Sequence, residues 1–119
     1  MARIALLCPD LLFGSKVEGS LTAAGHEVTR LDQEESARAE AARSELLIVD
    51  LTDPSFDGSM LVESMKMGRE LEGVRTLGFY AHVDQDTRRR AEDAGFDQVT
   101  PRSRLARDGP ALVEALLAG

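Results

Sequence analysis

The chain has 119 residues, of which 43% are hydrophobic and 29% are charged, and its formal net charge is −7. These proportions exclude a disordered chain and predict one folded domain over residues 1–119. No apolar run approaches the roughly 18 residues of a membrane span. The negative charge argues against binding to nucleic acid, and the absence of Trp argues against base stacking. A single cysteine and the lack of a signal peptide lead us to expect a cytoplasmic protein.

Five short apolar runs, each bounded by polar or turn residues, predict β-strands. They are Arg3–Cys8, Glu27–Leu31, Glu45–Leu51, Arg75–Tyr80 and Phe96–Thr100. Three of them, beginning at Arg3, Glu45 and Arg75, are almost continuously apolar, as strands covered on both faces of a parallel sheet are. Glu27–Leu31 alternates between polar and apolar residues, which is typical of an edge strand.

Segments with helical spacing lie between these runs. Val17, Leu21 and Ala24 share one helical face, and Gly25 follows as a natural end of that helix. Further helices are predicted at Ser36–Arg43, along the stripe Leu61, Met65 and Gly68, along the stripe Thr87, Ala91 and Ala94, and at Pro110–Ala118.

Strands that alternate with helices predict a parallel sheet with helices on both faces, connected by right-handed crossovers. For five strands and five helices we expect the flavodoxin-like three-layer α/β sandwich with strand order 2-1-3-4-5. In that order a ligand site lies outside the carboxyl ends of the first and third strands. The candidate pocket residues are therefore Asp10, Asp50, Thr52, Tyr80 and Arg102.

Asp50 ends a strongly apolar strand, so its carboxylate is expected at the mouth of this crevice. The following loop resembles the loop after the phosphorylated strand in receiver domains of two-component response regulators. Asp50, Pro54, Asp57 and Gly58 match the receiver pattern of Asp, three residues, Pro, two residues and Asp-Gly. The run Ala94–Asp97 is similar to the Ala-Gly-Ala-Asp turn before the fifth receiver strand. The resemblance covers essentially the whole chain and implies a receiver-type fold with Asp50 as the candidate phospho-acceptor.

The chain departs from the receiver pattern at the residues that bind Mg²⁺ and the phosphoryl group in receivers. Receivers end the first strand with two acidic residues that hold Mg²⁺, and the matching residues here are Cys8 and Pro9. Only Asp10, one residue later, offers a carboxylate to a metal that prefers several oxygen ligands. The lysine after the fifth receiver strand is matched by Arg102, which differs from lysine in reach and geometry. Asp50 thus matches the phospho-acceptor of receivers, whereas the residues that would support its phosphorylation differ.

The residues that switch a receiver between two states differ as well. In receivers a small hydroxyl residue moves toward the phosphoryl group, and an aromatic residue of the fifth strand then turns inward. The matching residues here are Tyr80 and Val99, so neither half of that switch is present. We therefore expect one dominant conformation.

This combination resembles the atypical, or pseudo-receiver, subgroup, in which the fold binds proteins and Mg²⁺-dependent phosphorylation is lost or weakened. We expect a stand-alone, non-enzymatic module without a cofactor, whose partner is a protein such as a histidine kinase or a downstream regulator. One alternative is a phosphorylatable receiver in which Asp10 and Asp50 hold Mg²⁺. In a second alternative, Asp50 is not phosphorylated and its carboxylate only caps the loop or pairs with Arg102.

Cys8 offers an alternative of a different class, a small phosphotransfer enzyme with a cysteine nucleophile. Phosphocysteine transfer subunits and low-molecular-weight tyrosine phosphatases place their nucleophile at this point of the fold. Such sites surround the phosphate with free backbone N–H groups, whereas Pro9 has none and Asp10 would repel a phosphate. The arginine of the phosphatase pattern is replaced by Gly14. The sequence favours a buried, inert Cys8.

Basic residues gather in the predicted fourth helix, fifth strand and following loop of an otherwise acidic chain. In receivers this surface is the usual dimer or partner face, so it is a candidate site for a protein partner or a homodimer. The alternative is a solvated helix whose arginines pair with Glu92 and Asp93. The candidate partner-binding residues are Arg88, Arg89, Arg90, Arg104 and Arg107.

Overall fold

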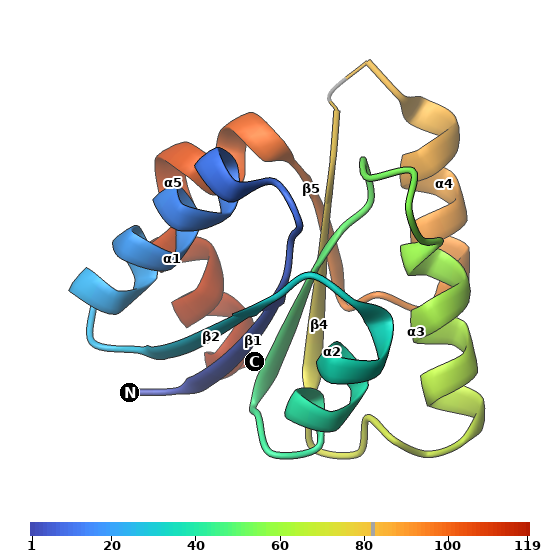
Figure 1. Cartoon of the computed structure of the whole chain (residues 1–119), viewed down its shortest axis with the longest axis horizontal. Coiled ribbons are helices and arrows are strands. Elements are labelled where there is room, and N and C mark those ends of the chain that lie inside the picture. Colours follow the sequence, from blue (N-terminus) through green and yellow to red (C-terminus); the bar gives the residue numbers. More distant parts are fainter. Residues whose placement is uncertain (82) are drawn as a thin grey trace.

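Five parallel strands form one sheet in the order β2-β1-β3-β4-β5, as predicted, in a computed structural model that describes residues 1–81 and 83–119 (Figure 1). The strands are β1 (Arg3–Leu7), β2 (Glu27–Leu31), β3 (Leu46–Asp50), β4 (Arg75–Tyr80) and β5 (Gln98–Pro101). The helices are α1 (Leu11–Ala23), α2 (Glu34–Ala41), α3 (Gly58–Met67), α4 (Gln85–Ala94) and α5 (Arg102–Ala118). His82, for which the sequence favours a solvated loop, lies outside the described residues.

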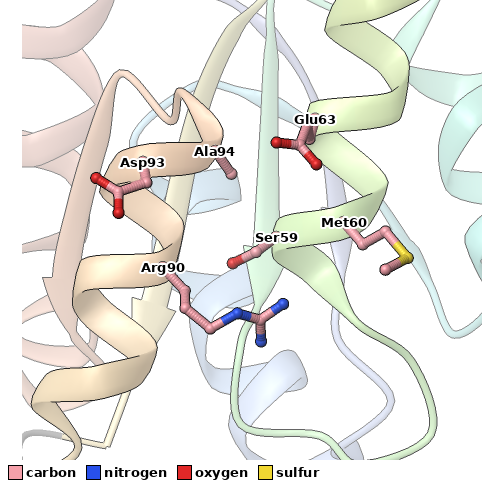
Figure 2. Close-up of a pocket in the computed structure, with 6 residues that line it drawn as sticks. All are labelled: Ser59, Met60, Glu63, Arg90, Asp93 and Ala94. Atoms are coloured by element: carbon pink, nitrogen blue, oxygen red, sulfur yellow. The ribbon is translucent and has the colours of Figure 1, made fainter.

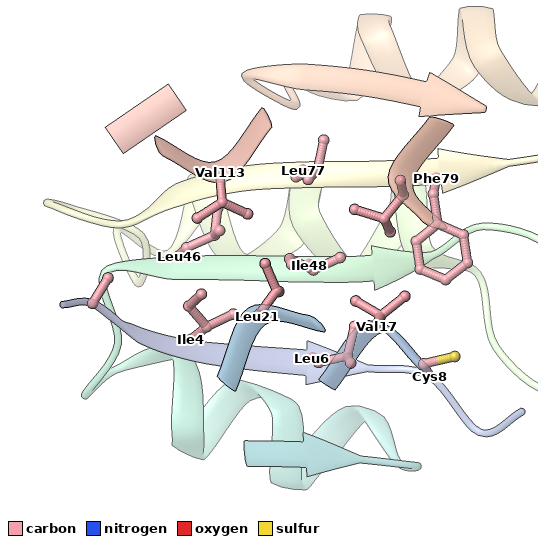
Figure 3. Close-up of a cluster of buried hydrophobic side chains, with 12 residues drawn as sticks. Ile4, Leu6, Cys8, Val17, Leu21, Leu46, Ile48, Leu77, Phe79 and Val113 are labelled. Carbon is pink, nitrogen blue, oxygen red and sulfur yellow. The ribbon is translucent and has the colours of Figure 1, made fainter. Parts of the chain in front are cut away.

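Helices cover both faces of the sheet. On one face the strand residues Leu6 and Ile48 pack against Val17 of α1, and α5 completes that layer (Figures 1 and 3). On the other face α2, α3 and α4 pack against the alternate residues, such as Leu7 and Val49. Because successive strand residues point to opposite faces, strands buried on both sides read as continuous apolar runs, which is why β1, β3 and β4 were recognisable in the sequence.

The strand register brings Cys8 and Asp50 together. Leu7 of β1 is paired with Val49 of β3, so the next residues, Cys8 and Asp50, are neighbours at the carboxyl edge of the sheet. Asp50 is in turn paired with Phe79 of β4. Cys8 and Phe79 both belong to the core beneath α1 and α5. The site at Asp50 therefore lies on the α1–α5 side of the sheet.

Aspartate side chains determine where three helices begin. Asp10, Asp57 and Asp84 each accept a hydrogen bond from a backbone N–H of the first turn of α1, α3 and α4, respectively. Helix α3 ends at Met67, one residue before Gly68 of the predicted stripe, and the turn that follows takes Arg69 to a φ of 57°. Within the described residues, none of the helices combines the length and apolar character needed to cross a bilayer.

Helix α5 differs from the prediction. It begins at Arg102, directly after β5, and not at Pro110. Asp108 has non-helical dihedral angles (φ −120°, ψ 20°), which bends the helix just before the proline. A proline inside a helix lacks an N–H donor and crowds the preceding turn, so a bend at this point is expected. Arg104 and Arg107, predicted in a loop, therefore lie on α5.

Candidate functional site

Asp50 is the last residue of β3 and is almost completely buried, with 2% of its surface exposed. Its Oδ1 accepts hydrogen bonds from the Thr52 backbone N–H at 2.8 Å and from the Thr52 hydroxyl at 2.6 Å. Such bonds from a residue two positions on are typical of an aspartate that closes a turn. The loop-capping role that the sequence allows for Asp50 is therefore present in the structure.

The other oxygen of Asp50 faces Cys8. The Cys8 thiol lies 3.7 Å from Asp50 Oδ2 and 3.7 Å from the backbone oxygen of Asp10, within donating distance of both. Burial, and next to it the negative charge of Asp50, raise the pKa of the Cys8 thiol to about 12. Only the thiolate is a good nucleophile, so this cysteine is a poor one at neutral pH. The predicted burial of Cys8 is confirmed.

Asp10 is directed to the start of α1 and to α5. Its Oδ1 accepts a hydrogen bond from the Phe13 backbone N–H at 3.1 Å, and its Oδ2 lies 3.5 Å from Nη2 of Arg102. The Phe13 N–H, together with the charge of Arg102, lowers the pKa of the Asp10 carboxyl. Of the two roles that the sequence allows for Asp50, pairing with Arg102 is not the one seen among the described residues, because Arg102 is paired with the exposed carboxylate of Asp10.

Phe13, which is not among the residues expected at the site, positions Arg102. The guanidinium carbon of Arg102 is 4.3 Å from the centre of the Phe13 ring, and that ring lies 5.1 Å from the ring of Phe79. Stacking of a cation on an aromatic face is attractive. The only signal in the sequence was an aromatic residue three positions after a helix-capping aspartate. Tyr80 is buried at the end of β4, and within the described residues the side-chain hydrogen bonds of Asp50 come from Cys8 and Thr52 instead of Tyr80.

Most of the predicted partner-binding arginines are in ion pairs within the chain. On α4, each arginine has an acidic partner, and Arg90 reaches toward α3 between the two helices (Figure 2). This contact raises the pKa of Arg90 and lowers that of Asp57. The pairs are Arg88–Glu92 (3.3 Å), Arg89–Asp86 (3.5 Å), Arg90–Asp57 (2.9 Å) and Arg107–Asp108 (3.1 Å). The predicted pairing with Glu92 is confirmed, whereas Asp93, the other predicted partner, is in no ion pair among the described residues, and Asp86 and Asp57 take its place.

No protein-family model matches the chain, and no curated protein sequence matches it. Solved structures match over nearly its whole length. A candidate response regulator from Chloroflexus aurantiacus J-10-fl is 21% identical, with a TM-score of 0.88 over 99% of this chain and 98% of that one. The receiver domain of the sensor histidine kinase PA1611 from Pseudomonas aeruginosa PAO1 is 17% identical, with a TM-score of 0.86 over 99% and 98% of the two chains. The chain has the receiver fold.

A further neighbour is the phosphorylated cyanobacterial phytochrome response regulator RcpA, which is 17% identical with a TM-score of 0.81 over 98% of this chain and 94% of that one. At these identities the likeness extends to the fold. The structure of the PA1611 receiver domain contains a magnesium ion coordinated in its active-site cleft. Whether Mg²⁺ could bind in the same way here depends on the donor atoms around Asp50.

The donors around Asp50 do not fit Mg²⁺. This ion requires a nearly octahedral set of oxygen ligands. Cys8, which faces Asp50, offers a protonated thiol, and the ring of Pro9 carries no donor atom. The oxygens of Asp50 already accept hydrogen bonds from Thr52 and Cys8, and Asp10 is directed to α1 and Arg102. In the part of the chain that the structure describes, no three His, Cys, Asp or Glu side chains are grouped to bind a metal.

Proposed function

We propose that this chain is a pseudo-receiver, a non-enzymatic module that regulates signal transduction by binding a protein. The observation that carries this proposal is the contact between the Cys8 thiol and Asp50 Oδ2 at 3.7 Å. A neutral thiol stands where the resemblance to receivers requires an acidic pair that binds Mg²⁺. The partner class that we propose is a histidine kinase or a downstream regulator, or a second copy of the chain.

Electrostatics give the reason that Asp50 is a poor acceptor. Transfer of a phosphoryl group to a carboxylate brings negative charges together, and a bound cation offsets that repulsion. Arg102 is the nearest basic replacement for the receiver lysine, but its charge is paired with Asp10. Asp50 is also 2% exposed and hydrogen bonded to Thr52, so a phosphoryl donor must displace the loop to reach it. Both features support a binding role without phosphorylation.

Addition of beryllofluoride and Mg²⁺ to the ¹⁵N-labelled chain tests the proposal. We expect backbone resonances at the ends of β3, β4 and β5 to stay in place, and Mg²⁺ alone to bind with a dissociation constant of about 1 mM or weaker. The double variant Cys8→Asp with Pro9→Asp supplies the missing oxygen ligands, so it should bind Mg²⁺ more tightly.

Two results would contradict the pseudo-receiver proposal. One is a movement of the wild-type resonances with beryllofluoride that disappears in Asp50→Asn, which would identify Asp50 as a working phospho-acceptor. The other is tight Mg²⁺ binding that is lost in Asp10→Asn, which would assign Asp10 to the metal. A matched control is Asp53→Asn, because Asp53 is half-buried in the same loop and accepts its hydrogen bonds from Ser55 instead.

A further inference from the structure

The distribution of ion pairs separates the cations of this chain into two groups. Within residues 1–81 and 83–119, nine of the fourteen Lys and Arg side chains are in ion pairs with Asp or Glu. The others are Lys16, Lys66, Arg69, Arg75 and Arg104. Three of these five unpaired cations, Lys66, Arg69 and Arg75, come together at one corner of the molecule. In a chain of net charge −7, such a group is conspicuous.

Two adjoining hollows bring these cations together. One, of about 370 Å³, is lined by Lys66, Arg69, Leu71 and Glu72. The other, of about 400 Å³, is lined by Lys66, Leu71, Gly73, Val74, Arg75 and Asp97. Since the hollows share Lys66 and Leu71, they form one surface. We call Lys66, Arg69, Leu71, Val74 and Arg75 the α3–β4 corner. It lies where α3 ends and β4 begins, at the edge of the sheet opposite Asp50 (Figure 1).

The local backbone keeps the first two cations at this surface. A Cβ atom added to Gly95 would lie 3.0 Å from Cδ of Lys66, so the aliphatic part of Lys66 packs over the end of α4. That end carries the negative pole of the helix, which favours a cation. The Glu70 N–H donates to the Met65 carbonyl at 2.8 Å and closes the end of α3. Arg69 sits inside this turn in a left-handed conformation that glycine adopts more readily.

The hollows at the α3–β4 corner are lined by more basic than acidic residues. Asp97 accepts hydrogen bonds from the Thr76 N–H at 2.8 Å and from the Thr76 hydroxyl at 3.2 Å, which direct it to β4. Glu72 is the other acidic residue that lines the hollows. The three cations therefore outnumber the acids, in contrast to α4, where each arginine is balanced by an acidic neighbour.

We propose that the α3–β4 corner binds an acidic, partly apolar segment of a protein partner. Three cations on the end of α3, the following turn and the start of β4 suit an extended segment with several carboxylates better than a single small anion. Leu71 and Val74 are the apolar residues that line the hollows, and Met67, the last residue of α3, is 83% exposed. This inference rests on the proposed function as a protein-binding module, and it moves the partner surface away from α4.

Titration of the ¹⁵N-labelled whole chain with a synthetic peptide of Glu and Leu residues tests the inference. We expect amide resonances of residues 66–75 to shift, and the affinity to fall as salt is added. A peptide with Gln in place of Glu should bind to the wild-type chain at least about tenfold more weakly than the acidic peptide. The acidic peptide should also bind at least about tenfold more weakly to the double variant Lys66→Glu with Arg69→Glu than to the wild type. The matched double variant Arg88→Glu with Arg89→Glu should change the affinity less than about twofold.

The variant Arg69→Gly excludes loss of folding as an explanation, because glycine suits the left-handed backbone while the cation is removed. It should weaken peptide binding without lowering the unfolding temperature. The inference is overturned if the peptide does not bind, if its shifts map to α4, or if both double variants weaken it equally. Inorganic phosphate that shifts the same resonances with the same affinity would also overturn it, since the corner would then be a small-anion site.

The outcome is separable from that of the beryllofluoride experiment. If beryllofluoride acts at Asp50 while the peptide still binds at the α3–β4 corner, the pseudo-receiver proposal fails and the binding surface stands. If Asp50 does not respond and the peptide binds elsewhere or not at all, the pseudo-receiver proposal stands and this surface is wrong.

Discussion

The environment of Asp50 is set by two residues from different parts of the chain. Thr52 donates twice to Oδ1 from the adjacent loop, and Cys8 lies against Oδ2 from the neighbouring strand. A thiol is a weak hydrogen-bond donor and, when protonated, a poor ligand for a hard cation. A change at Cys8 thus alters the chemistry available to Asp50 without altering the strand that carries it.

The first prediction concerns the reactivity of Cys8. Its pKa of about 12 and its burial mean that iodoacetamide at pH 7.5 should label the folded chain at least about a hundredfold more slowly than free cysteine. Mass spectrometry over time measures the rate, and the chain in denaturant is the control that should label fully. Rapid labelling of the folded chain would instead favour the cysteine-based phosphotransfer enzyme, and Cys8→Ser should then abolish any transfer activity.

At the scale of elements, glycines allow α3 and β4 to approach the neighbouring strand and loop. A Cβ added at Gly58 would lie 2.6 Å from Cγ1 of Val49 and 2.9 Å from Cδ2 of Leu51. A Cβ at Gly78 would lie 2.8 Å from Cδ1 of Leu51. Leu51, the residue after Asp50, is therefore packed between the start of α3 and β4. This packing positions the loop that carries Thr52.

The second prediction is that Gly58→Ala destabilises the fold by about 1–3 kcal/mol, because the added methyl group overfills a packed contact with Val49 and Leu51. Gly19→Ala is the matched control, since Gly19 is an exposed residue of α1 whose added Cβ meets nothing within 4 Å. The control should stabilise the chain by about 1 kcal/mol through helix propensity. Urea unfolding measures both values, and equal stability of Gly58→Ala and the wild type would disprove the tight contact.

At the scale of the whole molecule, carboxylates connect the layers to one another. Glu40 of α2 is buried, with 4% of its surface exposed. Its Oε1 accepts from Arg43 at 2.6 Å and its Oε2 from Arg3 of β1 at 3.2 Å. The bond from Arg43, and then that from Arg3, lower the pKa of Glu40. The carboxyls of Asp10, Asp57, Glu70 and Asp84 also have lowered pKa values.

The third prediction is the pH dependence of stability. A carboxyl whose pKa is lower in the folded state stabilises the fold above its unfolded pKa, and that stabilisation is lost as the pH falls through the folded value. The free energy of unfolding should therefore be nearly constant from about pH 7 to pH 5 and fall below about pH 4.5. Glu40→Gln should cost about 2 kcal/mol at pH 7 and reduce the difference between pH 7 and pH 3.

Glu114→Gln is the control for this prediction, because Glu114 is exposed on α5 and belongs to no ion pair among the described residues. It should change the free energy of unfolding by less than about 0.5 kcal/mol. If Glu40→Gln has the same pH profile as the wild type, the ion pairs of Glu40 with Arg3 and Arg43 do not contribute to stability.

The sequence by itself determined the sheet and indicated where a candidate site lies. Hydrophobic periodicity is a local property, so it identified the strands ending near Cys8, Asp50 and Tyr80, and alternation with helices led to their order. The presence of Cys8 and Pro9, where the resemblance to receivers leads one to expect an acidic pair, was likewise visible in the sequence. The start of α5 at Arg102 was missed because Pro110 resembles a helix start, whereas the helix continues through the proline with a bend at Asp108.

Only the tertiary structure decided which charges meet. Arg102 pairs with Asp10 instead of Asp50, and Arg90 with Asp57, although the paired residues are far apart in the chain. The α3–β4 corner was invisible in the sequence for the same reason. An ion pair depends on where two flexible side chains from separate elements end in space, and neither composition nor periodicity carries that information.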